Sequence, residues 1–197
     1  NDFEREVAPG LRRLRRSAIY NDANNYNVLV GGDGDLYRRN QQVVGLIDWG
    51  DMVHSITVAD LAVAIAYAVL DCSTRAELMA AASQIVRGYH AECPLVEEEV
   101  AALHGLVCLR LCMSACLAAY QARQRPGDPY LEVSQRSIRQ ILPLLSEVLR
   151  ELAETTYRYA CGWTPCPVGE RLTTWLAAKS GSFAPMLDVD VRQVLVL

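Results

Sequence analysis

The sequence predicts a mainly α-helical α+β fold that contains one small β-hairpin. Residues 18–30 pass from an Asn- and Asp-rich loop into the β-branched run Val28-Leu29-Val30. A Gly-rich turn follows, and Val43–Ile47 returns as the second strand of the hairpin. Beyond residue 58 the apolar residues recur with helical spacing. The predicted helices lie within 3–17, where Pro9 and Gly10 begin or interrupt the helix, and at 58–71, 75–92, 96–121, 131–158 and 168–179.

The composition is that of an ordinary globular chain. Of the 197 residues, 51% are hydrophobic and 21% are charged, which supports one buried core. The net charge of −4 gives no indication of a nucleic-acid partner. The longest apolar stretches, Val58–Leu70 and Val107–Ala119, are shorter than the roughly 18 residues that cross a bilayer, so we expect buried helices and no membrane partner. The polar, acidic start lacks a signal-peptide pattern and favours a cytoplasmic location.

The seven cysteines form no CxxC or CxxH ligand pattern. Cys108, Cys112 and Cys116 recur every four residues and therefore share one helix face. Three thiols on one face suit either a soft metal ion or small apolar packing. We interpret them as packing residues.

Four arginines crowd a short stretch near the N-terminus: Arg12, Arg13, Arg15 and Arg16. Such a cluster suits either contact with phosphate or the solvated face of a helix. Because the chain as a whole is acidic, we interpret the cluster as a solvated helix face.

The polar residues of the predicted hairpin match the needs of phosphoryl transfer. That reaction requires a carboxylate to take the proton of an acceptor hydroxyl, and metal ligands that neutralise phosphate charge. Asp22 is followed five residues later by Asn27, and the hairpin returns the chain so that Asp48 lies beside Asn27. Carboxylate and amide oxygens are the ligands that Mg²⁺ prefers. The spacing therefore predicts a proton acceptor next to a two-ligand magnesium site.

Three segments resemble the aminoglycoside phosphotransferase and choline kinase family. Asn21–Val30 resembles the H-G-D-x-H-x-x-N-V-L-V catalytic loop, and Gly45–Asp51 resembles the G-x-I-D-[FW] metal segment. Asp60-Leu61-Ala62 is similar to the D-L-A that begins the family's next helix. Within the family, the loop and the segment after residue 160 resemble hydroxylysine-kinase-like proteins, some of which are fused to a class III aminotransferase-like domain.

The resemblance implies a role for each polar residue. It implies that Asp22 is the catalytic base, and that Asn27 and Asp48 hold Mg²⁺ and, through it, the ATP or GTP that donates the phosphoryl group. Asp51 either joins the metal site, faces a cationic amine of the substrate or caps a short helix. Asp60 would be a buried hydrogen-bond support for the loop, with Tyr20 beside it.

The sequence departs from the family pattern at the start of the loop. Tyr20-Asn21 stands where the family has His-Gly, and Asn24 stands in place of its second His. Neither change removes the implied base or a metal ligand.

The resemblance also implies a domain organisation. Residues 1–159 would be the helical C-terminal lobe of a protein-kinase-like fold, with the catalytic loop and metal hairpin at 18–51 and the helical body at 58–158. Few residues precede Asp22, so we expect the N-terminal β-lobe of such a fold to be absent from this chain. Residues 160–197, rich in Gly and Pro, would be a connector toward a following domain.

The expected function is transfer of a nucleotide γ-phosphate to the hydroxyl of a small amino alcohol that resembles hydroxylysine or ethanolamine. Without the β-lobe, residues 1–197 alone would be inactive. Two other interpretations stay open: a non-catalytic binding module of kinase ancestry, and a plain helical interaction domain. In the second, Asp22 and Asn27 form an Asx-rich turn and Asp48 caps a strand end.

Overall fold

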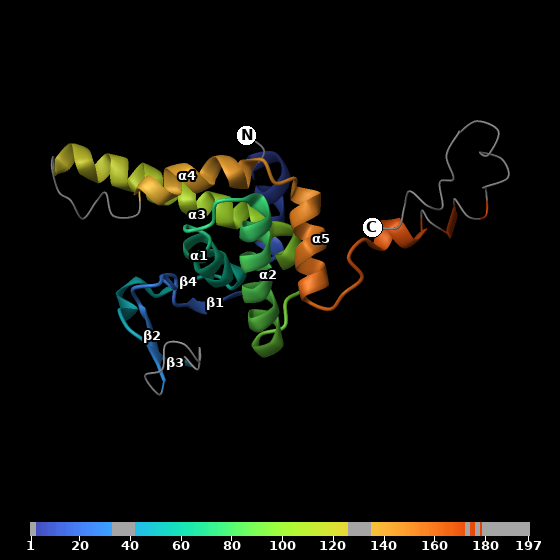
Figure 1. The fold of residues 1–197 in the computed structure, drawn as a ribbon, viewed down its shortest axis with the longest axis horizontal. Coiled ribbons are helices and arrows are strands. Elements are labelled where there is room, and N and C mark those ends of the chain that lie inside the picture. Colours follow the sequence, from blue (N-terminus) through green and yellow to red (C-terminus); the bar gives the residue numbers. More distant parts are fainter. Residues whose placement is uncertain (1–2, 33–41, 126–134, 172–173, 176–177, 179–197) are drawn as a thin grey trace.

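The computed structural model describes residues 3–32, 42–125, 135–171, 174–175 and 178. It confirms a mainly helical α+β chain with small antiparallel sheets. A helical body carries the two-stranded sheets at one end, and the hairpin extends away from the helices (Figure 1).

The N-terminal segment is less helical than predicted. It forms a π-helical turn, Phe3–Val7, and a 3-10 helix, Ala8–Arg13. The chain then becomes extended at Leu14 and enters strand β1, Arg16–Ile19, where the prediction had a helix to residue 17.

Strand β1 belongs to a sheet that the sequence did not predict. It pairs antiparallel with β4, Val53–Ile56, in the register Ile19↔Val53. The sequence predicts no strand between Asp51 and the helix at 58–71. Each of these strands has four residues and pairs with residues 34 to 40 positions away in the sequence. Local periodicity therefore gave too little signal to predict them.

The predicted hairpin is confirmed. Strand β2, Val28–Gly31, pairs antiparallel with β3, Gln42–Leu46, in the register Val28↔Leu46. The ladder is irregular between Leu29 and Val30. A 3-10 turn, η3, Trp49–Asp51, follows β3 directly.

Three long helices form the centre of the body. Helices α1, Val58–Ala68, α2, Arg75–Glu92, and α3, Glu97–Gln124, agree closely with the predicted ranges. Helices α1 and α3 pack directly against each other. Their shared core is fully buried and contains Val58, Leu61, Ile65, Leu103, Val107 and Leu111.

The prediction of a single helix at 131–158 is wrong, because the structure has two separate helices in this region. Helix α4, Gln135–Ser146, contains Pro143, which lacks the backbone N–H of a regular helix. The chain then turns and is extended at Leu149 before helix α5, Arg150–Ala160. The break lets α4 pack on α3 while α5 packs on α2 (Figure 1).

The chain after α5 stays against the body as far as Thr164. The buried Arg158 donates from Nε to the Thr164 carbonyl at 2.9 Å and lies over the ring of Trp163. The Trp163 ring contacts His90 of α2 edge to face. A helical turn at 167–171 follows, and the rest of the helix predicted at 168–179 lies mostly outside the described residues.

The second half of α3 is exposed, although Val107–Ala119 was predicted to be buried. Met113, Leu117 and Tyr120 are each more than half exposed. Cys112 and Cys116 are also exposed, so the interpretation of all three cysteines as packing residues is wrong. Cys108 is partly buried, and burial raises the pKa of its thiol to about 11. Helix α3 is long and apolar enough to cross a membrane, judged by length and composition only. The core helices of soluble proteins also meet these two criteria.

One of the clustered arginines has a specific buried partner. Arg15 donates from Nε and Nη2 to the two oxygens of Glu99, at 2.8 and 2.6 Å. The Glu99 side chain is fully buried and also accepts the backbone N–H of Val96 at the start of α3. The pair therefore fastens the segment before β1 to α3, and the solvated-face interpretation is wrong for this arginine.

Replacing Arg15 should destabilise the fold. In Arg15→Met the carboxylate of Glu99 stays buried without its cation, so we expect the free energy of unfolding to fall by about 2–3 kcal/mol. Urea denaturation measures this. Arg16→Met, at the exposed neighbouring position, should change it by less than about 0.5 kcal/mol. Equal stabilities for the two variants would contradict a structural role for the pair.

Candidate active site

The loop between β1 and β2 is anchored to the first turn of α1. Asp60 accepts the backbone N–H of Asn21 at 2.7 Å and that of Tyr20 at 3.3 Å. Asn21 has a φ of 65°, a left-handed conformation that Asn adopts more readily than most residues. Asp60 is half-buried, rather than buried as predicted. Its two hydrogen bonds fix the backbone immediately before Asp22.

Two amide side chains orient the carboxylate of Asp22. Its Oδ2 accepts from Nδ2 of Asn27 at 2.7 Å and from Nδ2 of Asn24 at 3.0 Å. Asn27 Nδ2 also donates to the Asp22 carbonyl, at 3.1 Å. Asn24, the residue in place of the family's second His, thus points at the implied base. With Oδ2 occupied, Oδ1 is the oxygen left to face an acceptor.

The hairpin brings Asp48 next to Asn27. The backbone N–H of Ile47 donates to the carbonyl of Asn27 at 3.0 Å, so the residue after Ile47 lies at the loop. Asp48 has a left-handed φ of 58°, and its Oδ1 accepts the N–H of Gly50 at 3.4 Å as the N-cap of η3. Its side chain is exposed, whereas Asn27 is buried.

Tyr20 ties the loop to the hairpin. Its hydroxyl donates a hydrogen bond to the carbonyl of Ile47, the residue before Asp48. Its ring packs edge to face against Trp49, with 5.0 Å between ring centroids. Because the backbone of Tyr20 also binds Asp60, this one residue connects α1, the loop and the end of β3.

The charges of three predicted carboxylates act on the Tyr20 hydroxyl. Burial raises the pKa of its hydroxyl, and the negative charges of Asp22, Asp48 and Asp51 raise it further. Asp51 is the exposed last residue of η3, and its carbonyl accepts from Nδ2 of Asn21 at 3.4 Å. The alternative in which Asp51 caps a short helix is wrong, because Asp48 occupies that position.

The oxygen atoms offered by Asn27 and Asp48 are of the kind that Mg²⁺ prefers. Among the described residues no group of three or more His, Cys, Asp or Glu side chains could hold a metal ion. Asn27 and Asp48 nevertheless offer one amide oxygen and one carboxylate from adjacent backbone positions. Mg²⁺ usually keeps several waters and binds through one or two protein oxygens together with substrate phosphates. The magnesium roles of Asn27, Asp48 and Asp51 remain predictions.

A functional candidate missing from the sequence prediction is Arg110. It projects from the middle of α3, and its Nη2 lies 3.5 Å from Asp22 Oδ1 and 3.2 Å from the hydroxyl of Tyr67. The guanidinium carbon lies 5.4 Å from the centroid of the Tyr67 ring. The sequence signal for it is a single arginine inside the apolar helical run Val107–Ala119.

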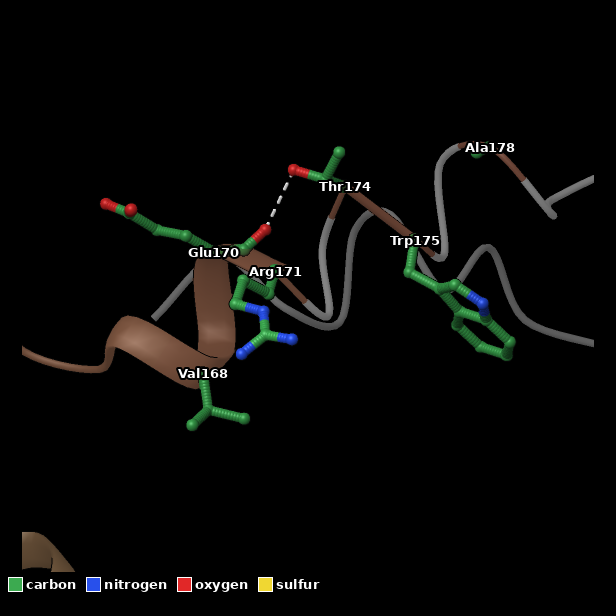
Figure 2. Close-up of a pocket in the computed structure, with 6 residues that line it drawn as sticks. All are labelled: Val168, Glu170, Arg171, Thr174, Trp175 and Ala178. Atoms are coloured by element: carbon green, nitrogen blue, oxygen red, sulfur yellow. Dashed lines mark hydrogen bonds between the residues drawn. The ribbon is translucent and has the colours of Figure 1, made fainter.

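Two surface hollows of the described chain contain none of these residues. Figure 2 shows one that is formed within the segment after α5, where Val168, Arg171 and Trp175 project around the helical turn. The Thr174 hydroxyl donates to the Glu170 carbonyl across it, at 2.8 Å. A second hollow lies between the start of α3 and Trp163. Neither contains a cluster of groups suited to catalysis.

Comparison with known protein families supports the site at the loop and hairpin. Residues 2–95 match the sequence pattern of the Phosphotransferase enzyme family, and this match supports the resemblance to aminoglycoside phosphotransferases and choline kinases. The matched range contains the whole loop, the hairpin and Asp60.

The individual relatives are hydroxylysine kinases. The chain is 28% identical over 167 residues to Hydroxylysine kinase of Bos taurus, a match that covers 81% of this chain and 44% of the relative. It is 30% identical over 135 residues to Hydroxylysine kinase of Danio rerio, which covers 68% of this chain and 36% of the relative. The chain spans less than half the length of the curated relatives it matches. No solved structure matches the chain.

Removing the anchor at Asp60 should loosen the loop. Asp60→Ala leaves the amides of Tyr20 and Asn21 without their acceptor, so we expect both to exchange with solvent faster. We also expect the free energy of unfolding to fall by about 1–3 kcal/mol. Hydrogen exchange followed by NMR measures the first effect, and urea denaturation the second.

Asp71→Ala is the matched control, because Asp71 is exposed just beyond the other end of α1. It should leave exchange in the loop unchanged. Protection of the Tyr20 and Asn21 amides that survives in Asp60→Ala would show that something other than Asp60 holds the loop.

Proposed function

We propose that the chain carries the catalytic half of a phosphotransferase that moves the γ-phosphate of ATP or GTP to the hydroxyl of a small amino alcohol. The observation that carries the proposal is the orientation of Asp22. Asn24 and Asn27 occupy Oδ2 of its carboxylate, while Oδ1 makes only a long contact of 3.5 Å with Arg110 among the described residues. The family relationship supports the same reaction class.

The proton transfer follows from this geometry. An acceptor hydroxyl that donates to Asp22 Oδ1 would give up its proton there as its oxygen attacks the γ-phosphorus. The new O–P bond forms while the bond to the bridging oxygen of the nucleoside diphosphate breaks, and the electron pair leaves with the diphosphate. Asn27 contributes by holding Asp22 in place and by standing next to Asp48.

Asn27 and Asp48 would hold the Mg²⁺ of the nucleotide, with Asp51 nearby. Bound there, Mg²⁺ neutralises phosphate charge during transfer. The buried Asn27 supplies a fixed ligand, and the exposed Asp48 supplies one that a nucleotide can reach from solvent.

The charge of the site supports an amine-bearing acceptor. Asp22, Asp48 and Asp51 all act on the Tyr20 hydroxyl, so three carboxylates lie within electrostatic reach of one side chain. Such a cluster attracts an ammonium group. The relatives are named for hydroxylysine, which carries an amine next to the hydroxyl, and ethanolamine shares that arrangement.

The rest of the proposal concerns the whole protein. The chain would be the helical C-terminal lobe of a protein-kinase-like fold in a cytoplasmic enzyme, with the nucleotide-binding β-lobe supplied by sequence outside it. Matches to only 36–44% of the relatives' length support this division. Residues 160–197 would lead to a following domain. We expect residues 1–197 alone to show little or no turnover.

The test is a phosphorylation assay on the full-length polypeptide that contains this chain. Hydroxylysine and ethanolamine are offered with ATP or with GTP, and formation of the phosphorylated product is measured. Asp22→Asn keeps the shape of the side chain but removes its basicity, so we expect kcat to fall by about 10²- to 10⁴-fold.

Asn25→Ala is the control, because Asn25 lies exposed in the same loop. It should retain activity within about threefold, as expected for a surface change away from the chemistry. Full activity in Asp22→Asn would contradict the assigned base. Absence of activity toward every acceptor in the unaltered protein would favour the non-catalytic binding module.

A further inference from the structure

Arg110 places a cation beside the oxygen of Asp22 that is left for the acceptor. Its Nη2 lies 3.5 Å from Oδ1, while Oδ2 is occupied by Asn24 and Asn27. An acceptor hydroxyl bound to Oδ1 would therefore lie beside the guanidinium group. Whatever group reacts with that hydroxyl must also approach to within reach of Arg110.

The contact between Arg110 and Asp22 is too slight to explain the placement of the arginine. For comparison, the Arg15–Glu99 ion pair in the same chain makes two hydrogen bonds, at 2.6 and 2.8 Å. Arg110 instead reaches Asp22 with one nitrogen at 3.5 Å. Among the described residues its buried Nε has no hydrogen-bond partner at all.

Tyr67 holds the guanidinium group in position without neutralising it. Its hydroxyl accepts from Arg110 Nη2 at 3.2 Å, and its ring lies 5.4 Å from the guanidinium carbon. A cation over an aromatic face keeps its full charge. The side chain of Arg110 is also only 23% exposed, so less water screens that charge than at the surface.

We propose that Arg110 binds the phosphoryl group during its transfer, and that Tyr67 positions Arg110 for this contact. This inference rests on the proposed function. As the acceptor oxygen bonds to phosphorus and the bridging P–O bond to the nucleoside diphosphate breaks, negative charge spreads over the non-bridging oxygens. A preorganised guanidinium donor beside them stabilises that charge. The acceptor proton still passes to Asp22, and the electron pair still leaves with the diphosphate.

The arrangement also separates two charges in the acceptor pocket. A guanidinium group repels an ammonium group, so the amine of the acceptor would lie away from Arg110. The carboxylates of Asp48 and Asp51, at the two ends of η3, would attract the amine instead. Arg110 is therefore assigned to the phosphoryl group and not to the amine.

The experiment compares Arg110→Met, Arg110→Lys and Tyr67→Phe in the full-length polypeptide. We expect Arg110→Met to lower kcat by about 100-fold or more, with the KM of the amino alcohol changed by less than about threefold. Arg110→Lys should recover only part of the loss, because it restores charge without the planar fork. Tyr67→Phe should lower kcat less than either. Arg123→Met, at an exposed arginine of the last turn of α3, should leave kcat and KM unchanged.

A second measurement is independent of turnover. Inorganic phosphate, added as a probe, should raise the melting temperature of the unaltered protein and that of Arg123→Met, but not that of Arg110→Met. If no acceptor is phosphorylated and phosphate still discriminates between these proteins, the anion site stands while the proposed function fails. If Arg110→Met does not fold, Arg110→Lys alone decides between the two roles.

Two results would overturn the inference. One is a rise in KM for the amino alcohol with kcat unchanged in the Arg110 variants, which would assign Arg110 to acceptor binding. The other is normal kcat together with an unchanged response to phosphate, which would leave Arg110 with only a structural role.

Discussion

The candidate site depends on the hydrogen bonds between Asp60 and the loop. A loop rich in Asn and Asp has many alternative hydrogen bonds available, and by itself selects no single conformation. Asp60, at the start of α1, accepts two successive backbone N–H groups and so fixes the path of the chain just before Asp22. Helix α1 is in turn fixed by its buried face against α3. The packing of the helical core therefore determines where the backbone before Asp22 lies.

The site combines buried supports with exposed reactive groups. Asn27 and the ring of Tyr20 are buried and make the contacts that hold Asp22 and the end of β3 in register. Asp48 and Asp51 are exposed at the surface. Arg110 supplies the one positive charge in contact with Asp22 among the described residues. Negative charge on the side of the hairpin and positive charge on the side of α3 give the site a polarity that suits a substrate with two different charged ends.

The sequence predicted local features well and long-range ones poorly. The hairpin, the three long helices and the proximity of Asn27 to Asp48 depend on periodicity and on spacing within thirty residues, and the structure contains them. The β1–β4 sheet, the break after Pro143 and the Arg15–Glu99 pair depend on partners that a local pattern does not reveal. Arg110 was missed for the same reason, because Asp22 lies 88 residues away. The chemical roles stay predictions, since only activity measurements test them.

The described chain has two left-handed non-glycine residues, Asn21 directly before Asp22 and Asp48 after the hairpin. For most side chains that backbone conformation carries a steric penalty, and Asn, Asp and Gly tolerate it best. The left-handed backbone therefore limits which amino acids position 48 tolerates, independently of any ligand. In a saturation library, selection for folding alone would already enrich these three residues. Selection for catalytic activity would then favour Asp over Asn and Gly. The requirements of folding and of catalysis could therefore be distinguished at this one position.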